Sequence, residues 1–198
     1  MSLLLVNSTI YIYGLFHILY MIAKYIIKTE DDNHDTNKIM LYVNVSECSS
    51  DIQKKYHRKA EEFNSKSNDI YRDAGFDLFI NDTVSPDGDK DITFDHKVSC
   101  ALFKGSKPLA YKLYPRSSIS KRNIMLKNSA GIIDSGYRGN LIAKCVAIKD
   151  SASTASYEKG ERIFQVCTGT LEPFDEVHIV YKLNDTTRGS GGFGSTGN

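Results

Sequence analysis

Short runs of apolar, β-branched and aromatic residues follow one another along most of this chain, each bounded by glycine, proline, aspartate or serine. Such runs are typical of β-strands separated by turns. One charged segment, residues 51–63, instead predicts a short helix with Ser50 or Asp51 as its cap. Many strands with one helix, and without strand–helix alternation, indicate an all-β domain, a β-barrel or jelly-roll-like sandwich. The expected strands are residues 40–45, 75–80, 92–103, 109–114, 132–134, 140–148, 163–167 and 177–183.

The beginning of the chain has a different pattern. Residues 10–27 form an apolar run interrupted only by Gly14, His17 and Lys24, and its 18 residues are near the lower limit for crossing a bilayer. Three interpretations stay open: a membrane anchor, a targeting leader, or an upstream extension that is not translated. Met40 opens a strand-like segment, so a start at that residue would leave the following domain intact.

These patterns divide the chain into three parts. Residues 1–39 are an apolar segment with a polar linker, residues 40–183 are the expected barrel domain, and residues 184–198 are a flexible glycine-rich arm. Membrane contact is expected only through residues 1–28. The protein is expected in the cytoplasm or nucleus, or at a membrane if residues 10–27 are retained as a spanning helix.

Composition excludes some classes of function. Lys and Arg number 25 and Asp and Glu 24, a net charge of +1, so bulk charge indicates neither nucleic acid nor a membrane surface as a partner. An anionic small ligand remains compatible, because it needs only a few local cations. The four cysteines are widely spaced and form no Cys-x-x-Cys motif, so free thiols are expected rather than a metal or redox site.

The segment of residues 131–140 carries one carboxylate at the end of an apolar strand. Asp134 follows two isoleucines and precedes a turn, and a second strand begins near Leu141. This pattern predicts a β-hairpin in which Gly136 and Gly139 supply backbone freedom. Asp134 would then point toward a water molecule beside Tyr137. Ordinary turn chemistry is the alternative interpretation of the same residues.

Four further segments contain candidate ligand-binding groups. Residues 73–79 place Asp77 on an apolar strand, and residues 114–121 combine an arginine with two hydroxyls, groups that suit phosphate oxygens. Residues 160–165 enter a strand that carries Gln165, a neutral donor for phosphate. Residues 188–197 are rich in glycine but lack the Gly-Lys-Ser/Thr ending of a Walker loop, so they instead predict a mobile arm that folds over a ligand.

Taken in order, the five segments resemble the five motifs of the trimeric dUTP pyrophosphatase (dUTPase) family. The resemblance covers residues 40–198, whereas residues 1–39 match nothing in the family core. Two small departures are Ser118, where a glycine is common, and Glu161, where an aspartate is common. The matching stretches read AGFDL, PRSS, GIIDSGYRG, GERIFQ and RGSGGFGSTG.

The resemblance implies hydrolysis of dUTP to dUMP and pyrophosphate by attack of water on the α-phosphorus, which limits uracil in DNA and supplies dUMP for dTMP synthesis. Asp134 would be the general base. Tyr137 would pack under the deoxyribose, and Asn128 with the backbone of Gly131 and Ile133 would read uracil.

The resemblance also implies how the phosphates are held. Asp77 would bind Mg²⁺ through water, because this hard ion keeps part of its hydration shell. The arm would cross to another subunit of a homotrimer with shared active sites, and Phe193 would stack on the base. The expected phosphate-binding residues are Arg116, Ser117, Ser118 and Gln165, joined from the arm by Arg188, Gly194, Ser195 and Thr196.

Three alternatives stay open from the sequence. A dCTP deaminase-like enzyme shares the fold and the handling of a triphosphate, although it lacks this glycine-rich arm. A non-catalytic regulatory homologue would keep the fold without turnover. A membrane-tethered variant would have a partner role beyond hydrolysis.

Overall fold

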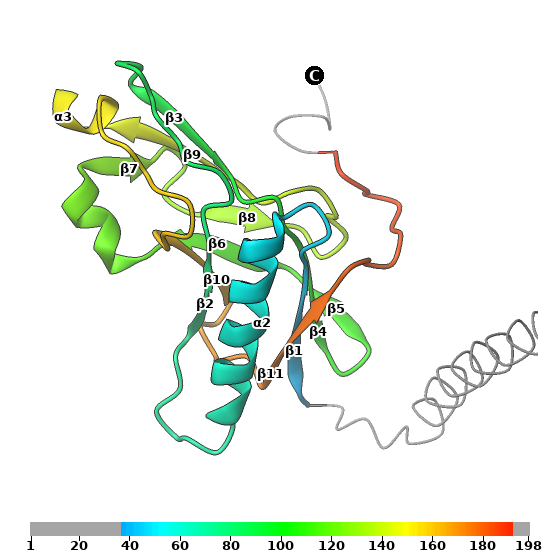
Figure 1. The fold of residues 1–198 in the computed structure, drawn as a ribbon. Helices are drawn as coiled ribbons and strands as arrows, with labels where there is room; N and C mark the ends of the chain where they lie inside the picture. Colours follow the sequence, from blue (N-terminus) through cyan, green and yellow to red (C-terminus); the bar gives the residue numbers. More distant parts are fainter. Residues whose placement is uncertain (1–36, 192–198) are drawn as a thin grey trace, which may run out of the picture. The chain divides into compact units, whose positions relative to one another are not determined.

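The computed structural model describes residues 37–191 of the 198-residue chain, and these residues belong to one compact unit. Within this range the chain forms eleven β-strands, two α-helices and one 3-10 helix (Figure 1). The expected all-β class with one main helix is confirmed. The predicted apolar run at residues 10–27 lies outside the described residues, and so do four predicted arm residues, Phe193, Gly194, Ser195 and Thr196.

The elements follow the expected pattern of short strands. In chain order they are β1 (Ile39–Asn44), α2 (Ser50–Ser65), β2 (Gly75–Leu78), β3 (Asp91–Asp95), β4 (Ser99–Lys104), β5 (Lys107–Leu109), β6 (Tyr111–Pro115), η1 (Ser117–Arg122), β7 (Ile124–Leu126), β8 (Gly131–Ile133), β9 (Ile142–Ala147), α3 (Asp150–Ser153), β10 (Phe164–Thr168) and β11 (Glu176–Val180). Within residues 37–191, no helix is sufficiently long and apolar to span a bilayer.

The strands form three sheets with the orders β11-β1-β4-β5, β2-β10-β6-β8 and β3-β9-β7. In the second sheet, β10 pairs antiparallel with both β2 and β6, and β6 pairs antiparallel with β8. This register places Gln165 opposite Asp77 on one side and Tyr114 on the other. Three of the five motifs identified in the sequence therefore meet on neighbouring strands.

Helix α2 packs one face on the core. Its buried residues Ile52, Tyr56, Ala60 and Phe63 recur at helical spacing, so one stripe of the helix is apolar. The Phe79 N–H donates to Tyr56 Oη at 2.9 Å, which ties the helix to the end of β2. Figure 1 shows α2 running alongside the strands of the domain.

The observed elements correct several predicted boundaries. The helix is longer than expected, and its N-cap is Ser49, whose side chain makes no capping hydrogen bond, rather than Ser50 or Asp51. The expected strand at residues 92–103 is two strands, because the chain turns at Lys97, where φ is +56°. The expected strand at 109–114 also divides, and β7 was not predicted.

The predicted hairpin around Asp134 is wrong. Strand β8 pairs with β6, whereas β9 pairs with β3 and β7, so the connection from Asp134 to Leu141 passes between two sheets. Gly136 and Gly139 are not among the described glycines with positive φ. Gly139 is required for space instead, since a Cβ there would lie 2.5 Å from the Tyr137 Oη.

Candidate active site

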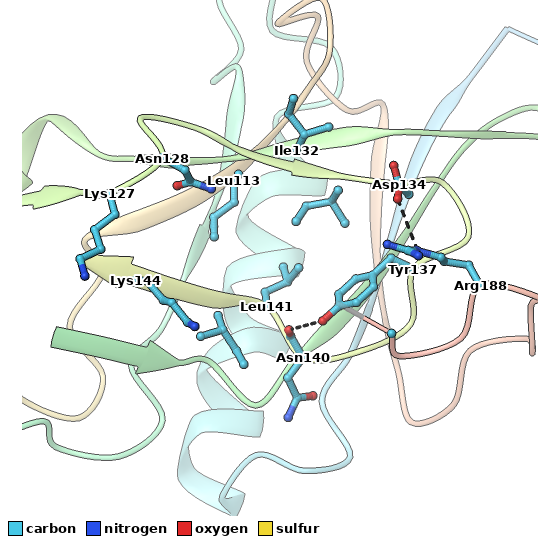
Figure 2. Close-up of a pocket in the computed structure, with 14 residues that line it drawn as sticks. Leu113, Lys127, Asn128, Ile132, Asp134, Tyr137, Asn140, Leu141, Lys144 and Arg188 are labelled. Atoms are coloured by element: carbon cyan, nitrogen blue, oxygen red, sulfur yellow. Dashed lines mark hydrogen bonds and ion pairs between the residues drawn. The ribbon is translucent and has the colours of Figure 1, made fainter. Parts of the chain in front are cut away.

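An apolar cavity of about 400 Å³ lies between β8, the turn that follows it and the start of β9 (Figure 2). Six of the residues predicted as site residues line this one cavity: Asn128, Gly131, Ile133, Asp134, Tyr137 and Arg188. The other lining residues include Leu113 on β6 and Lys127 and Lys144 on the rim. The segment from Asn128 to Tyr137 and Arg188 of the arm therefore line one concave site.

Asp134 follows the last residue of β8, and its side chain is 63% exposed. Its carbonyl oxygen accepts a hydrogen bond from the Tyr137 N–H at 3.0 Å, which fixes the turn. Its Oδ2 lies 3.5 Å from Arg188 Nε, as Figure 2 shows. The carboxylate is thus held at the mouth of the cavity, within reach of solvent.

Tyr137 forms one wall of the cavity. Its hydroxyl donates to the Asn140 carbonyl oxygen at 3.1 Å (Figure 2). Asn140 Nδ2 in turn donates to Glu47 Oε2 at 2.8 Å. Burial raises the pKa of the Tyr137 hydroxyl, and the charge of Asp95 adds to this effect. The ring is therefore a fixed, neutral surface beside the carboxylate of Asp134.

Strands β8 and β6 approach closely at the floor of the cavity. A Cβ at Gly131 would lie 3.2 Å from Leu113 Cβ, tighter than most real contacts of this kind. The absence of a side chain at Gly131 therefore allows β8 to lie close to β6 at the floor of the cavity.

A second cavity, of about 710 Å³, holds the other predicted phosphate-binding groups. The predicted residues that line it are Asp77, Arg116, Ser117 and Gln165. Ser118 does not line this cavity. Its hydroxyl lies 3.5 Å from the Arg162 carbonyl oxygen, which also accepts a hydrogen bond from Arg116 Nη1 at 2.6 Å. Asp73 also lines this cavity, and so do two charged residues that were not predicted as site residues, Lys59 and Arg162.

Asp77 binds two arginines. Its Oδ1 lies 2.6 Å from Arg116 Nε and its Oδ2 lies 3.1 Å from Arg162 Nη1, and the residue is only 7% exposed. Burial raises the pKa of the Asp77 carboxyl, while Arg116, and more weakly Lys59 and Arg162, oppose this shift. Arg162 could have been recognised in the sequence as the cation three residues before Gln165.

The donor set of this cavity suits a hydrated ion better than a directly bound one. Asp73 and Asp77 supply hard carboxylate oxygens of the kind that Mg²⁺ takes. Both oxygens of Asp77 are engaged by guanidinium groups, and no three His, Cys, Asp or Glu side chains among residues 37–191 form a metal-binding group. Contact through water is therefore the mode that these residues fit.

The two cavities have no lining residue in common. Adjacent residues on β6 separate them, because Leu113 lines the first and Tyr114 the second, as the alternation of a strand requires. The described chain therefore brings the predicted base and uracil-reading residues together with Arg188 in the first cavity, whereas Arg116, Ser117 and Gln165 lie together in the second.

The start of the C-terminal arm lies on the turn that follows Asp134. The Arg138 N–H donates to the Gly189 carbonyl oxygen at 2.8 Å, and the Thr186 hydroxyl donates to the Gly136 carbonyl oxygen. These contacts bring Arg188 to the first cavity within the same chain. The arm residues predicted to reach a neighbouring subunit lie beyond Gly191, outside the described residues.

Comparison with known proteins identifies the class. The dUTPase family model matches residues 61–197, most of the chain, so the chain belongs to the dUTPase family. It is 34% identical over 128 residues to the deoxyuridine 5'-triphosphate nucleotidohydrolase of Rhodococcus erythropolis, which covers 63% of this chain and 74% of that protein. The mitochondrial human protein of the same name is 32% identical over 148 residues, 74% of this chain and 55% of that protein.

A phage protein and a solved structure show the same likeness. The deoxyuridine 5'-triphosphate nucleotidohydrolase of Escherichia phage T5 is 40% identical over 83 residues, 42% of this chain and 55% of its own. The crystal structure of the dUTPase from Streptococcus mutans superposes with a TM-score of 0.43 at 25% identity, over 54% of this chain and 82% of that chain.

Proposed function

We propose that this protein is a dUTP diphosphatase that hydrolyses dUTP to dUMP and pyrophosphate. The observation that carries the proposal is that six residues singled out in the sequence line one apolar cavity in a member of the dUTPase family. The family matched also favours this activity over the dCTP deaminase alternative. The products would limit uracil in DNA and supply dUMP for dTMP synthesis.

The first cavity supports recognition of deoxyuridine. Asn128 and the backbone of Gly131 and Ile133, which line this cavity, would pair with the uracil edge, and cytosine would leave buried polar atoms without partners. The Tyr137 ring would pack under the deoxyribose. The hydrogen bond from its hydroxyl to the Asn140 carbonyl oxygen would hold the ring in this position, against a ribose 2′-hydroxyl.

Asp134 would act as the general base. Its exposed carboxylate takes a proton from a water molecule as the water oxygen forms a bond to the α-phosphorus, and pyrophosphate leaves with the electrons of the broken P–O bond. Its place at the mouth of the cavity lets a water molecule reach the carboxylate from solvent.

The separation of the two cavities supports a homotrimer with shared active sites. A nucleotide bound beside Asp134 needs the cations of the second cavity near its phosphates, and one described chain holds these groups apart. A second copy would supply Arg116, Ser117 and Gln165, with Ser118 behind them, and the arm would add Phe193, Gly194, Ser195 and Thr196. Each site would then be complete only in the assembly.

Mg²⁺ is proposed as the cofactor, bound by the substrate phosphates and reached by Asp77 through water. The ion would neutralise charge that develops on the phosphate oxygens. Asp77 would orient a coordinated water while staying bound to Arg116 and Arg162.

For location, the four buried free cysteines support a reducing compartment, so we propose the cytoplasm or nucleus. Retention of residues 10–27 as a spanning helix would instead anchor the protein at a membrane. Sequencing the N-terminus of the protein isolated from its source would decide between Met1 and Met40.

The test of this function is hydrolysis of dUTP by the full-length protein, with dCTP assayed in parallel for release of ammonia. Asp134→Asn should lower turnover by about 10²–10⁴-fold, because the water loses its base. Binding of the non-hydrolysable imido analogue of dUTP should be retained. Asp185→Asn is the matched control, since Asp185 is an exposed carboxylate that lines neither cavity.

Equal turnover in Asp134→Asn and Asp185→Asn would remove Asp134 from the mechanism. Release of ammonia from dCTP would contradict the proposed function and favour a deaminase. Light scattering during gel filtration should give the mass of a trimer, and an active monomer would contradict the shared sites.

A further inference from the structure

Lys59 of helix α2 lines the second cavity, together with the groups predicted to bind phosphates. The family model begins its match at residue 61, so Lys59 lies outside the matched region, on a helix that the five motifs do not include. No motif therefore assigns this lysine a role.

The position of Lys59 is set by packing of the helix. Tyr56 and Phe63, three residues before it and four after it, are both buried in the core. The helix is fixed near both ends of this stretch, since Tyr56 Oη binds the Phe79 N–H and Asn64 exchanges two hydrogen bonds with Val177. Lys59 is thus held on the flank of the buried face, and its side chain is only 13% exposed.

The charges of the second cavity would balance without Lys59. The charged lining residues other than Lys59 are two arginines, Arg116 and Arg162, and two aspartates, Asp73 and Asp77. Both arginines are already paired with Asp77. Lys59 is therefore the residue that makes the cavity cationic.

The ammonium group of Lys59 is paired with one exposed acid and also lies in the field of Asp77. The acid nearest to it is Glu62, at 3.8 Å, and Glu62 Oε1 also lies 3.4 Å from Lys66 Nζ. Glu62 is more than half exposed, so its attraction for the ammonium is screened by water. A phosphate entering the cavity could replace this contact at little cost.

We propose that Lys59 binds the polyphosphate of the nucleotide in the second cavity, as a third cation beside Arg116 and Arg162. The lysine attracts phosphate as a compact point charge with three donors, whereas the two arginines remain bridged to Asp77. This assignment rests on the proposed dUTP diphosphatase function and adds to that site a cation from α2.

The experiment compares Lys59→Met with Lys54→Met in the full-length protein. Methionine keeps most of the buried aliphatic length and removes the charge. Lys54 is an exposed lysine of the same helix that lines neither cavity, so its variant controls for the loss of one positive charge. Thermal unfolding of both variants establishes that α2 is retained.

The expected result is a rise in KM for dUTP of about tenfold in Lys59→Met, the loss of one charge-assisted contact, with no change in Lys54→Met. Affinity for deoxyuridine, which has no phosphate, should be unchanged in both. Lys59→Arg should restore most of the affinity for dUTP. If Lys59→Met does not fold, Lys59→Arg and Lys59→Gln provide the same comparison of charge.

Equal KM values in the Lys59 and Lys54 variants would overturn the proposal, and so would an equal loss of affinity for deoxyuridine and dUTP, which indicates a structural role. If the wild-type protein does not hydrolyse dUTP, the proposed function fails instead. Binding of inorganic tripolyphosphate in the presence of Mg²⁺ then decides the role of Lys59, because that ligand needs neither the base-reading cavity nor turnover.

Discussion

Arg188 Nε lies 3.5 Å from Asp134 Oδ2, and both residues line the first cavity. The arm that carries Arg188 is attached to the turn after Asp134 by the hydrogen bonds of Gly189 and Thr186. The C-terminal segment therefore places a guanidinium group beside the predicted base of its own chain. Substrate phosphates entering the cavity would meet the same group.

Arg188→Ala should lower kcat/KM for dUTP by about 10- to 100-fold, because the guanidinium beside Asp134 would donate charge-assisted hydrogen bonds to the incoming phosphates. Arg188→Lys should recover only part of this loss, since an ammonium lacks the fork of donors. Lys182→Ala is the control, an exposed cation just before the arm that lines neither cavity. Steady-state kinetics that give Arg188→Ala and Lys182→Ala the same kcat/KM would contradict this role.

Tyr56→Phe should lower the free energy of unfolding by about 1–3 kcal/mol, because the buried Phe79 N–H loses the hydroxyl that accepts its hydrogen bond while the ring is kept. The control is Tyr71→Phe, since Tyr71 is 87% exposed. Urea unfolding of both variants at one protein concentration measures the difference. A Tyr56→Phe curve that coincides with that of Tyr71→Phe would mean that this hydrogen bond does not anchor α2.

The pattern of residues in short stretches of the sequence was sufficient to predict most strands and six of the residues that line the first cavity. The residues from Asn128 to Tyr137 are close in sequence, so a strand and a turn bring them together whatever the rest of the fold does. The pairing partners were not predictable in the same way. Strand β8 was expected to pair with β9, but it pairs with β6, because the register depends on contacts between distant strands.

The second cavity shows the same limit. Asp77, Arg116 and Gln165 belong to three strands that meet only in the folded sheet, and the sequence contains no sign that Arg162 shares Asp77 with Arg116. Lys59 was hidden for another reason. A charged residue on an amphipathic helix is usually exposed, and only the packing of Tyr56 and Phe63 shows that this one faces a cavity.

Acidification should destabilise the fold through His96. This residue is fully buried, its Nδ1–H donates to the Phe79 carbonyl oxygen at 3.0 Å, and its Nε2 has no hydrogen-bond partner among residues 37–191. Burial lowers the pKa of His96 from 6.5 to about 4, although the bond to Phe79 opposes this shift. The unfolded chain therefore binds a proton at higher pH than the folded protein does.

The contribution of neutral His96 is fully present above pH 6.5 and is lost as the pH falls from 6.5 through about 4. The shift corresponds to about 3 kcal/mol over that window.

Unfolding free energies measured at pH 7, 6 and 5 should decrease in the wild type and decrease less in His96→Gln, which has no titrating ring. His57→Gln is the control, because His57 lies outside the core on α2 and contacts Tyr181. Parallel pH profiles of the wild type and His96→Gln would show that another group controls the acid sensitivity.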